Sequence, residues 1–289
     1  YRDAKVDELC NHDTTTNVPR GAKSTLLYEA AAHGFVKSVT YLIKDRLASV
    51  NGPQVEGARR TIAYWPLLAA VKPVLRANED LSTRKAAQAQ VVDVLLENGA
   101  DVSIVDGRRR NLLQQAMVPS FRVHSSFRLQ LPFLETFEKL AAHHRDPEKL
   151  PKLSLDTTDA VYGMSTMTAA VVRNRVDLVR VLVDKERGFG LDVNEAVAGP
   201  DGVPRTPLEH ACVSDSYIDI VKLLVESGAT VDRANATTGH SPLDLAAMHG
   251  AEGVFKFLSE GEKAPIAVSK ANLARLDGWR AVASPLPDP

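Results

Sequence analysis

Two stretches in the carboxyl-terminal third of the chain decide how it folds: Thr206-Pro207-Leu208-Glu209-His210-Ala211-Cys212 and Ser241-Pro242-Leu243-Asp244-Leu245-Ala246-Ala247-Met248-His249-Gly250. The second begins 35 residues after the first, and an apolar run with helical spacing follows each. Proline suits the first turn of a helix, and a preceding serine or threonine can cap the free N–H groups there. The phrase therefore predicts a repeated unit of two helices.

Four weaker copies of this phrase precede the two clear ones. The six copies begin at positions 25, 65, 111, 165, 206 and 241, at intervals of 40, 46, 54, 41 and 35 residues. Helices that stack on two neighbours have fixed lengths, so the excess residues are expected in loops. The sequence predicts one insertion roughly from Lys72 to Ala89, with the helix resuming at Val91, and a second from Val118 to about Leu131, with a helix near Phe133 to His143.

The phrase and its spacing resemble the ankyrin repeat, a β-turn plus two helices of about 33 residues with a T-P-L-H-x-A signature. The resemblance covers about Thr25 to Gly261 and implies an all-α solenoid of helix-turn-helix units with finger loops and two insertions. The chain departs from the family at the signature histidine, where it has Tyr28, Leu68, Gln114, Thr168, Glu209 and Asp244. Of these, Glu209 and Asp244 are expected to accept hydrogen bonds from turn amides.

We expect three regions along the chain. Residues 1–23 form an N-terminal cap or extension with an early helix from Asp3 to Cys10. Residues 24–261 form the repeat array, and residues 262–289 form a C-terminal capping helix, Ser269 to Trp279, and a tail. Gly34 and Gly250 are expected to end inner helices in the left-handed conformation.

Composition excludes several classes of function. The 35 basic and 36 acidic residues give a net charge of -1, which argues against a nucleic-acid partner. The sequence contains no run of 18 or more apolar residues, so it predicts no membrane span. The two cysteines, Cys10 and Cys212, favour a reducing location over a disulfide framework, so the sequence predicts an intracellular protein, cytoplasmic or nuclear.

A repeat array has no single enclosed core for a catalytic pocket, but it presents an extended concave surface. The family resemblance implies that a protein or peptide binds in this groove, against the fingers and inner helices. The sequence leaves the oligomeric state open. The residues expected at the partner are Tyr64, Trp65, Arg108, Arg109, Arg110, Gln115, Arg173, Arg205, His210, Ser214, Arg233, His240 and His249, with Met248 beside them.

Two members of this set have competing interpretations. Arg108, Arg109 and Arg110 could clamp an acidic peptide or a phosphate, because arginine presents a fixed donor fork, or they could form a solvated turn. Trp65 could be a binding hot spot, but its place at the capping position, next to Pro66, favours packing into the base of the finger.

An enzyme remains the alternative hypothesis. The chain has no glycine-rich phosphate loop, no nucleophile elbow and no H-E-x-x-H motif, and we predict no cofactor and no metal. A small-molecule or catalytic pocket between the insertions and the inner helices would have to use His210, Asp215, Tyr217 and His249 as acid–base groups. Binding is the favoured hypothesis, and catalysis stays open.

Overall fold

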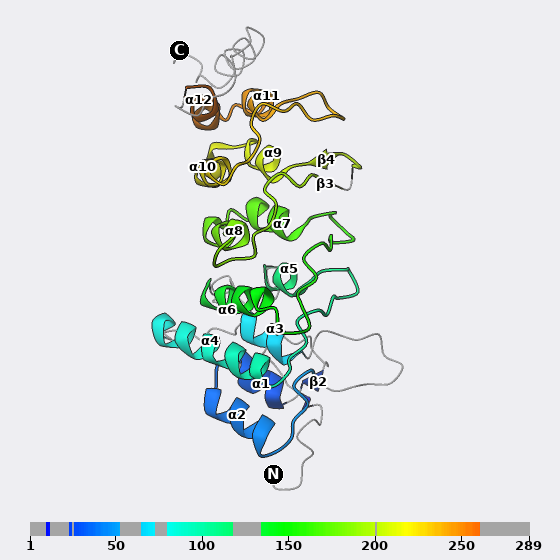
Figure 1. Cartoon of the computed structure of the whole chain (residues 1–289), viewed down its shortest axis with the longest axis vertical. Helices are drawn as coiled ribbons and strands as arrows, with labels where there is room; N and C mark the ends of the chain where they lie inside the picture. Colours follow the sequence, from blue (N-terminus) through cyan, green and yellow to red (C-terminus); the bar gives the residue numbers. More distant parts are fainter. Residues whose placement is uncertain are drawn as a thin grey trace, which may run out of the picture. The chain divides into compact units, whose positions relative to one another are not determined.

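The computed structural model describes residues 10–11, 23–24, 26–52, 65–72, 80–117, 134–199 and 201–260. The chain divides into two compact units, Tyr1–Ala160 and Val161–Pro289, and Figure 1 labels the helices and strands of both. The division falls inside the expected repeat array, between the third and fourth copies. Among the described residues, no helix is both long enough and apolar enough to cross a bilayer.

In the described part of the first unit, three inner helices each begin at a copy of the repeated phrase, and an outer helix follows each. They are α1 (Leu26–Ala32) and α2 (Val36–Lys44), α3 (Pro66–Val71) and α4 (Leu81–Glu97), and α5 (Leu112–Met117) and α6 (Leu134–Arg145). Inner helix α1 packs on α3, while outer helix α4 packs on both α2 and α6. A short antiparallel ladder of β1 (Cys10–Asn11) and β2 (Lys23–Ser24) precedes α1.

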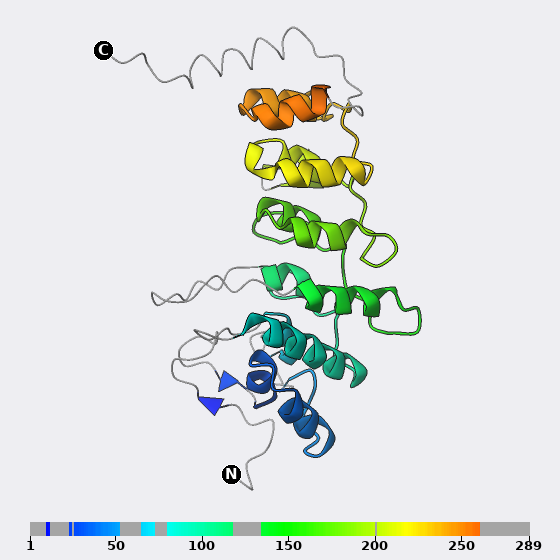
Figure 2. The same ribbon diagram turned by 90° about the vertical axis from the view of Figure 1, so that its left-hand side faces the viewer.

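The second unit repeats the same arrangement more regularly. Figure 2 shows its helix pairs, in green, yellow and orange, as successive layers. The pairs are α7 (Thr166–Val172) and α8 (Val176–Val183), α9 (Pro207–Ala211) and α10 (Ile218–Glu226), and α11 (Pro242–Met248) and α12 (Glu252–Glu260). A 3-10 turn, η2 (Asp215–Tyr217), leads into α10, and the strands β3 (Val197–Ala198) and β4 (Pro204–Arg205) form an antiparallel finger before α9.

Small residues line the contacts between inner helices. The alanine pairs of the repeated phrase are buried in the described copies, and Cys212 takes the place of the second alanine with no exposed surface. Burial and the nearby Glu209 charge raise the pKa of the Cys212 thiol, so this free thiol stays protonated and inert at neutral pH. Cys212 therefore packs as a small buried apolar residue between the inner helices.

An asparagine ties neighbouring repeats together at equivalent places in the two units. In the first unit, the side chain of Asn51 donates to the carbonyl of Gly99 and accepts from the amide of Asp101. In the second, Asn194 makes the same two bonds with Gly228 and Thr230, at 3.0 and 2.7 Å. The carbonyls and amides at the end of an outer helix are thus satisfied by the preceding repeat.

The first insertion differs from its prediction. The outer helix does not resume at Val91 but already begins at Leu81, so that part of the insertion is helical. Asp80 caps this start by accepting from the amides of Ser82 and Thr83, and the hydroxyls and amides of these two residues lower the pKa of Asp80 to about 2. The extra turns place Arg84 and Gln88 in the core, where they donate to the carbonyls of Ala32 and Ala31, both at 2.6 Å.

The predicted early helix is wrong at its end, because Cys10 pairs as a strand residue with Ser24. The rest of that helix, Asp3 to Leu9, lies outside the described residues. So do the second insertion from Val118 to Leu131 and the C-terminal helix from Ser269 to Trp279. The predicted left-handed glycines are confirmed, since Gly34 and Gly250 both have φ of 65°.

Candidate functional site

The inner helices of the second unit all start with the same polar cap. The side-chain oxygens of Ser165, Thr206 and Ser241 accept from the backbone N–H three residues on, at 3.2, 3.2 and 3.1 Å. In two of them the third residue returns a bond, because Glu209 accepts from the amide of Thr206 and Asp244 from the amide of Ser241, both at 2.9 Å. These capping boxes confirm the expected role of Glu209 and Asp244.

Because the three helices start alike, residues at equal distances from the caps lie at equivalent places. Seven residues after the caps stand Val172, Val213 and Met248, of which Val172 is 39 % and Met248 42 % exposed. The next residues are Arg173, Ser214 and His249. Helix α7 packs on α9 and α9 on α11, so these positions are neighbours. We call them the helix-end surface: Val172, Arg173, Val213, Ser214, Met248 and His249.

The polar members of the helix-end surface are partly held by their own backbone. Arg173 is half-buried and donates from Nη1 to the carbonyl of Ala169 at 3.0 Å. Ser214 caps the 3-10 turn by accepting from the amide of Ser216. His249 ends α11 and is exposed. The surface therefore combines an apolar column with a polar border.

His210 lies one helical turn after its cap and is half-buried. Burial lowers the pKa of His210, the charge of Arg205 lowers it further, and Asp201 opposes the shift. The imidazole is therefore neutral at pH 7 and acts as a hydrogen-bonding group of the inner-helix face rather than a cation.

The fingers of the second unit are held by side chains. In the β3–β4 finger, Asp201 and Arg205 form an exposed ion pair at 2.7 Å, and the hydrogen bond from Arg205 lowers the pKa of Asp201. In the next finger, Asn235 accepts from the amides of Thr237 and Thr238, so it organises the turn. Arg233 in that finger is exposed, and His240 is half-buried.

The three arginines of the first unit divide into two kinds. Arg110 donates to Asp106 from Nε and Nη2 at 2.7 and 2.6 Å and lies 3.7 Å from Asp159. The Asp106 carboxylate also accepts from the amides of Arg108 and Arg110, which closes a tight turn. The side chains of Arg108 and Arg109 are exposed at its tip. Only these two of the three are available to a partner.

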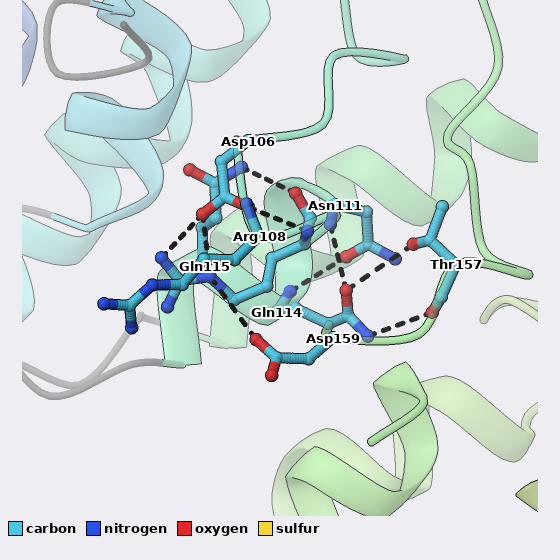
Figure 3. Close-up of polar contacts among 8 residues, drawn as sticks. Asp106, Arg108, Asn111, Gln114, Gln115, Thr157 and Asp159 are labelled. Atoms are coloured by element: carbon cyan, nitrogen blue, oxygen red, sulfur yellow. Dashed lines mark hydrogen bonds and ion pairs between the residues drawn. The ribbon is translucent and has the colours of Figure 1, made fainter. Parts of the chain in front are cut away.

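Amide side chains replace the usual cap in the third copy. Asn111 and Gln114 form a reciprocal box, each side-chain oxygen accepting from the other backbone N–H at 2.9 Å (Figure 3). Gln114 also donates to the carbonyl of Thr157, and Asn111 to that of Ser154. The departure from the signature histidine therefore still gives a satisfied turn.

Two predicted binding residues of the first unit are internal. Trp65 is 3 % exposed at the start of α3, which corrects its place among the partner residues and favours the packing interpretation. Gln115 is 6 % exposed and donates to the carbonyl of Arg110 at 3.0 Å, so it also supports the finger rather than the groove. Tyr64 lies outside the described residues.

The acid–base groups of the enzyme hypothesis have structural roles. Asp215 accepts from the amide of Val254 at 2.9 Å, which caps α12, and the hydroxyl of Tyr217 donates to the carbonyl of Val172 at 3.3 Å. Among the residues that the structure describes, no group of three His, Cys, Asp or Glu side chains could hold a metal ion. Asp215 and Tyr217 are thus both engaged in hydrogen bonds with backbone groups of other repeats.

Comparison with known proteins agrees with this architecture. The family model for ankyrin repeats (3 copies) matches residues 133–235. The structure superposes on the ankyrin repeat protein EF0377 with a TM-score of 0.54 at 22% identity, over 81% of this chain and 96% of that one. It superposes on the ankyrin repeat domain of Bcl-3 with a TM-score of 0.56 at 20% identity, over 88% and 98%. The chain has the ankyrin-repeat fold.

Sequence relatives cover shorter stretches of this ankyrin-repeat chain. Protein phosphatase 1 regulatory subunit 27 of Mus musculus is 36% identical over 94 residues, which are 32% of this chain and 54% of that protein. The ankyrin repeat and KH domain-containing protein mask-1 of Caenorhabditis elegans is 38% identical over 76 residues, 23% of this chain and 3% of that protein. The match thus spans about half of the first relative and a small part of the second.

Ankyrin-repeat domains generally serve as protein-interaction modules. Of the residues at the helix-end surface, the sequence analysis named Arg173, Ser214, Met248 and His249 as expected partner contacts, and it did not name Val172 and Val213. The sequence pattern could have indicated these two valines, because Val172, Val213 and Met248 all stand seven positions after the capping Ser or Thr.

Proposed function

We propose that this ankyrin-repeat chain binds a protein or peptide partner on the helix-end surface of its second unit. The observation that carries the proposal is the repetition of solvent-accessible side chains at the same two positions of three inner helices with similar caps. Val172, Met248 and His249 are exposed, and the other three members of the helix-end surface are half-buried. Large exposed apolar side chains bordered by polar ones are typical of interaction sites. Arg205, Arg233 and His240 on the fingers provide additional polar contacts.

The spacing of the surface indicates what kind of segment it takes. Packed helices lie about 8–10 Å apart, and a polyproline II chain advances about 3.1 Å per residue with three residues per turn. A partner segment in this conformation therefore places every third side chain on the same side, against the next inner helix. We expect apolar residues three positions apart, opposite Val172, Val213 and Met248, and a carboxylate near Arg173 or Arg233.

The repeat scaffold supports binding because its surface is preorganised. The capping boxes, the Asn194 bridge and the Asp215 cap fix the inner helices and fingers before a partner arrives. A preformed surface loses less conformational entropy on association than a flexible one. The first partner to test is the catalytic subunit of protein phosphatase 1, because one relative is named as a regulatory subunit of that enzyme.

The experiment compares three baits: the wild-type chain, a Val172→Glu/Met248→Glu variant, and a Leu150→Glu control at a 74 % exposed site in the first unit. Circular dichroism first checks that all three are folded. Partners are captured from lysate, identified by mass spectrometry, and titrated by calorimetry, with purified phosphatase 1 catalytic subunit as a defined probe. We expect a partner that binds wild type and control alike and binds the double variant at least tenfold more weakly. Equal affinity for the double variant would refute the proposed site.

A further inference from the structure

The first repeat carries a separate apolar surface, which the proposed function does not use. An open depression of about 510 Å³ lies on α1 and α2. Three of its apolar side chains are strongly exposed: Leu26 at 42 %, Phe35 at 47 % and Tyr41 at 52 %. We call this surface, with Lys37, Ser38 and Leu42, the α1–α2 face.

The repeat formed by α11 and α12 shows what this face looks like when it is covered. Gly34 and Gly250 end the two inner helices with the same φ and so align the two repeats. The residue after the glycine is the exposed Phe35 in one repeat and Ala251, 2 % exposed, in the other. Four residues after the glycine, Ser38 is exposed, whereas Val254 is fully buried. Leu42 is half-buried, whereas Leu258 is 2 % exposed.

The cover in the second unit is a helix with a carboxylate at its start. Helix α10 and the turn η2 pack on α12, and α9 packs on α11. The carboxylate of Asp215 accepts from the amide of Val254 at 2.9 Å, and a Cβ built on Gly253 would lie 3.2 Å from the Asp215 Oδ1 atom. The preceding repeat therefore provides both the helix that covers α12 and the carboxylate that accepts from the first turn of α12.

The α1–α2 face has the matching groups, and no helix of the described residues covers it in the way that α10 covers α12. Helix α2 starts at Phe35 with no side-chain cap and no acidic residue in its first turn. The amide of Ser38, equivalent to that of Val254, has no acceptor among the described residues. Lys37 is exposed and forms no ion pair with a described residue, whereas Glu29 already lies 4.0 Å from His33. Lys37 is therefore the exposed charged side chain among those that line the depression.

We propose that the α1–α2 face binds an amphipathic helix of a partner protein. The apolar side of this helix covers Phe35, Tyr41 and Leu42, and a carboxylate near its start accepts from the amide of Ser38 beside Lys37. The geometry follows that of α10 and Asp215 on α12. Helix-in-groove recognition of this kind uses apolar anchors for affinity and the charged group for orientation.

The test uses the chain's own covering segment as a probe. A fluorescein-labelled peptide of residues 214–226 is constrained by a lactam between Lys222 and Glu226, both of which are exposed in the protein. Fluorescence anisotropy then measures its binding to the full chain. We expect saturable binding that is at least tenfold weaker with Tyr41→Glu, several-fold weaker with Lys37→Glu or with Asp215→Ala in the peptide, and unchanged with the Leu150→Glu control. Absent binding, or equal binding by Tyr41→Glu, overturns the proposal.

A second measurement distinguishes a partner helix from two other occupants. The full chain with Tyr41→p-benzoylphenylalanine is irradiated alone and with the peptide, and the cross-linked products are mapped by mass spectrometry. Cross-linking to the peptide supports the proposal. Cross-linking of the chain alone to its own N-terminal residues, or to a second copy, overturns it. Because Tyr41 lies outside the helix-end surface, Tyr41→Glu leaves binding at that surface unchanged, so the two proposals fail separately.

Discussion

The side-chain amide of Asn235 lies 3.0 Å from the carboxylate of Glu209, which joins the finger of one repeat to the helix cap of the preceding one. The same amide donates to the carbonyl of Pro204 at 2.6 Å. Glu209 is 4 % exposed and also accepts from the amide of Thr206. One buried carboxylate therefore holds a helix start and a neighbouring finger together.

Replacing Glu209 with alanine is expected to destabilise the chain by about 1–3 kcal/mol, because two donors lose a buried acceptor. Urea denaturation followed by circular dichroism measures the change. Glu209→Gln, which keeps one acceptor, should lose less. Asp201→Ala, which removes an exposed ion pair, serves as the control and should leave the midpoint almost unchanged. A Glu209→Ala midpoint equal to that of the control would show that the bridge does not contribute.

Two glycines with similar backbone conformations should respond very differently to alanine. At Gly34, with φ of 65°, an added Cβ would lie 2.6 Å from Gln88 Oε1 and 2.9 Å from Arg84 Nη1. At Gly228, with φ of 93°, nothing lies within 4 Å. Gly228→Ala should cost about 1–2 kcal/mol from backbone strain alone, and Gly34→Ala about 1–3 kcal/mol more from overpacking. Equal losses of unfolding free energy in the two variants, measured by denaturation in parallel, would mean that Arg84 and Gln88 on α4 move aside at no cost.

Trp65 and Arg109 should separate into a stability residue and a surface residue. Trp65→Ala is expected to cost about 3–5 kcal/mol, because it empties a large buried site at the start of α3. Arg109→Ala should stay within about 0.5 kcal/mol, because the side chain is exposed. Thermal denaturation of the two single variants checks both values. A stable, folded Trp65→Ala protein would contradict the buried placement of the indole.

Stability should fall as the pH is lowered from 7.5 to 5.5. Burial lowers the pKa of His143, His144 and His210 below the ordinary value of 6.5, so the unfolded chain binds protons before the folded chain does. Stability contributed by the neutral form is thus lost as pH falls through 6.5 toward the folded pKa values, and no further loss follows below them. Burial raises the pKa of Asp177, but the hydrogen bond and charge of Arg175 outweigh this effect and lower the pKa overall. The resulting contribution to stability changes only at pH values near and below 3.8.

The melting temperature at both pH values checks this prediction. His210→Gln should reduce the difference between the two temperatures, because it removes one of the three groups. His249→Gln, at the exposed end of α11, is the matched control. A pH difference that is identical in wild type and His210→Gln would show that His210 is not responsible.

Local sequence was sufficient for the helix starts. Thr206-Pro207 and Ser241-Pro242 contain both the cap and the first turn, so they predict α9 and α11 without reference to any distant residue. Local sequence failed for α4, whose start at Leu81 depends on the burial of Arg84 and Gln88 against carbonyls of α1 more than 50 positions earlier. It also placed Gln115, and Trp65 in one of its two interpretations, among the surface residues, because position within a repeat does not show what the neighbouring repeat covers.

The sequence by itself determined the repeat, its caps and its left-handed glycines, because each depends on residues only a few positions apart. The tertiary structure alone decided which side chains remain exposed. Arg110 pairs with Asp106, four positions earlier, and also lies 3.7 Å from Asp159, 49 positions later, while Arg108 and Arg109 stay at the surface. Phe35 is exposed where its equivalent Ala251 is buried. The reason is that a repeat buries its faces only against its neighbours, so identical local patterns give different surfaces according to what packs on them.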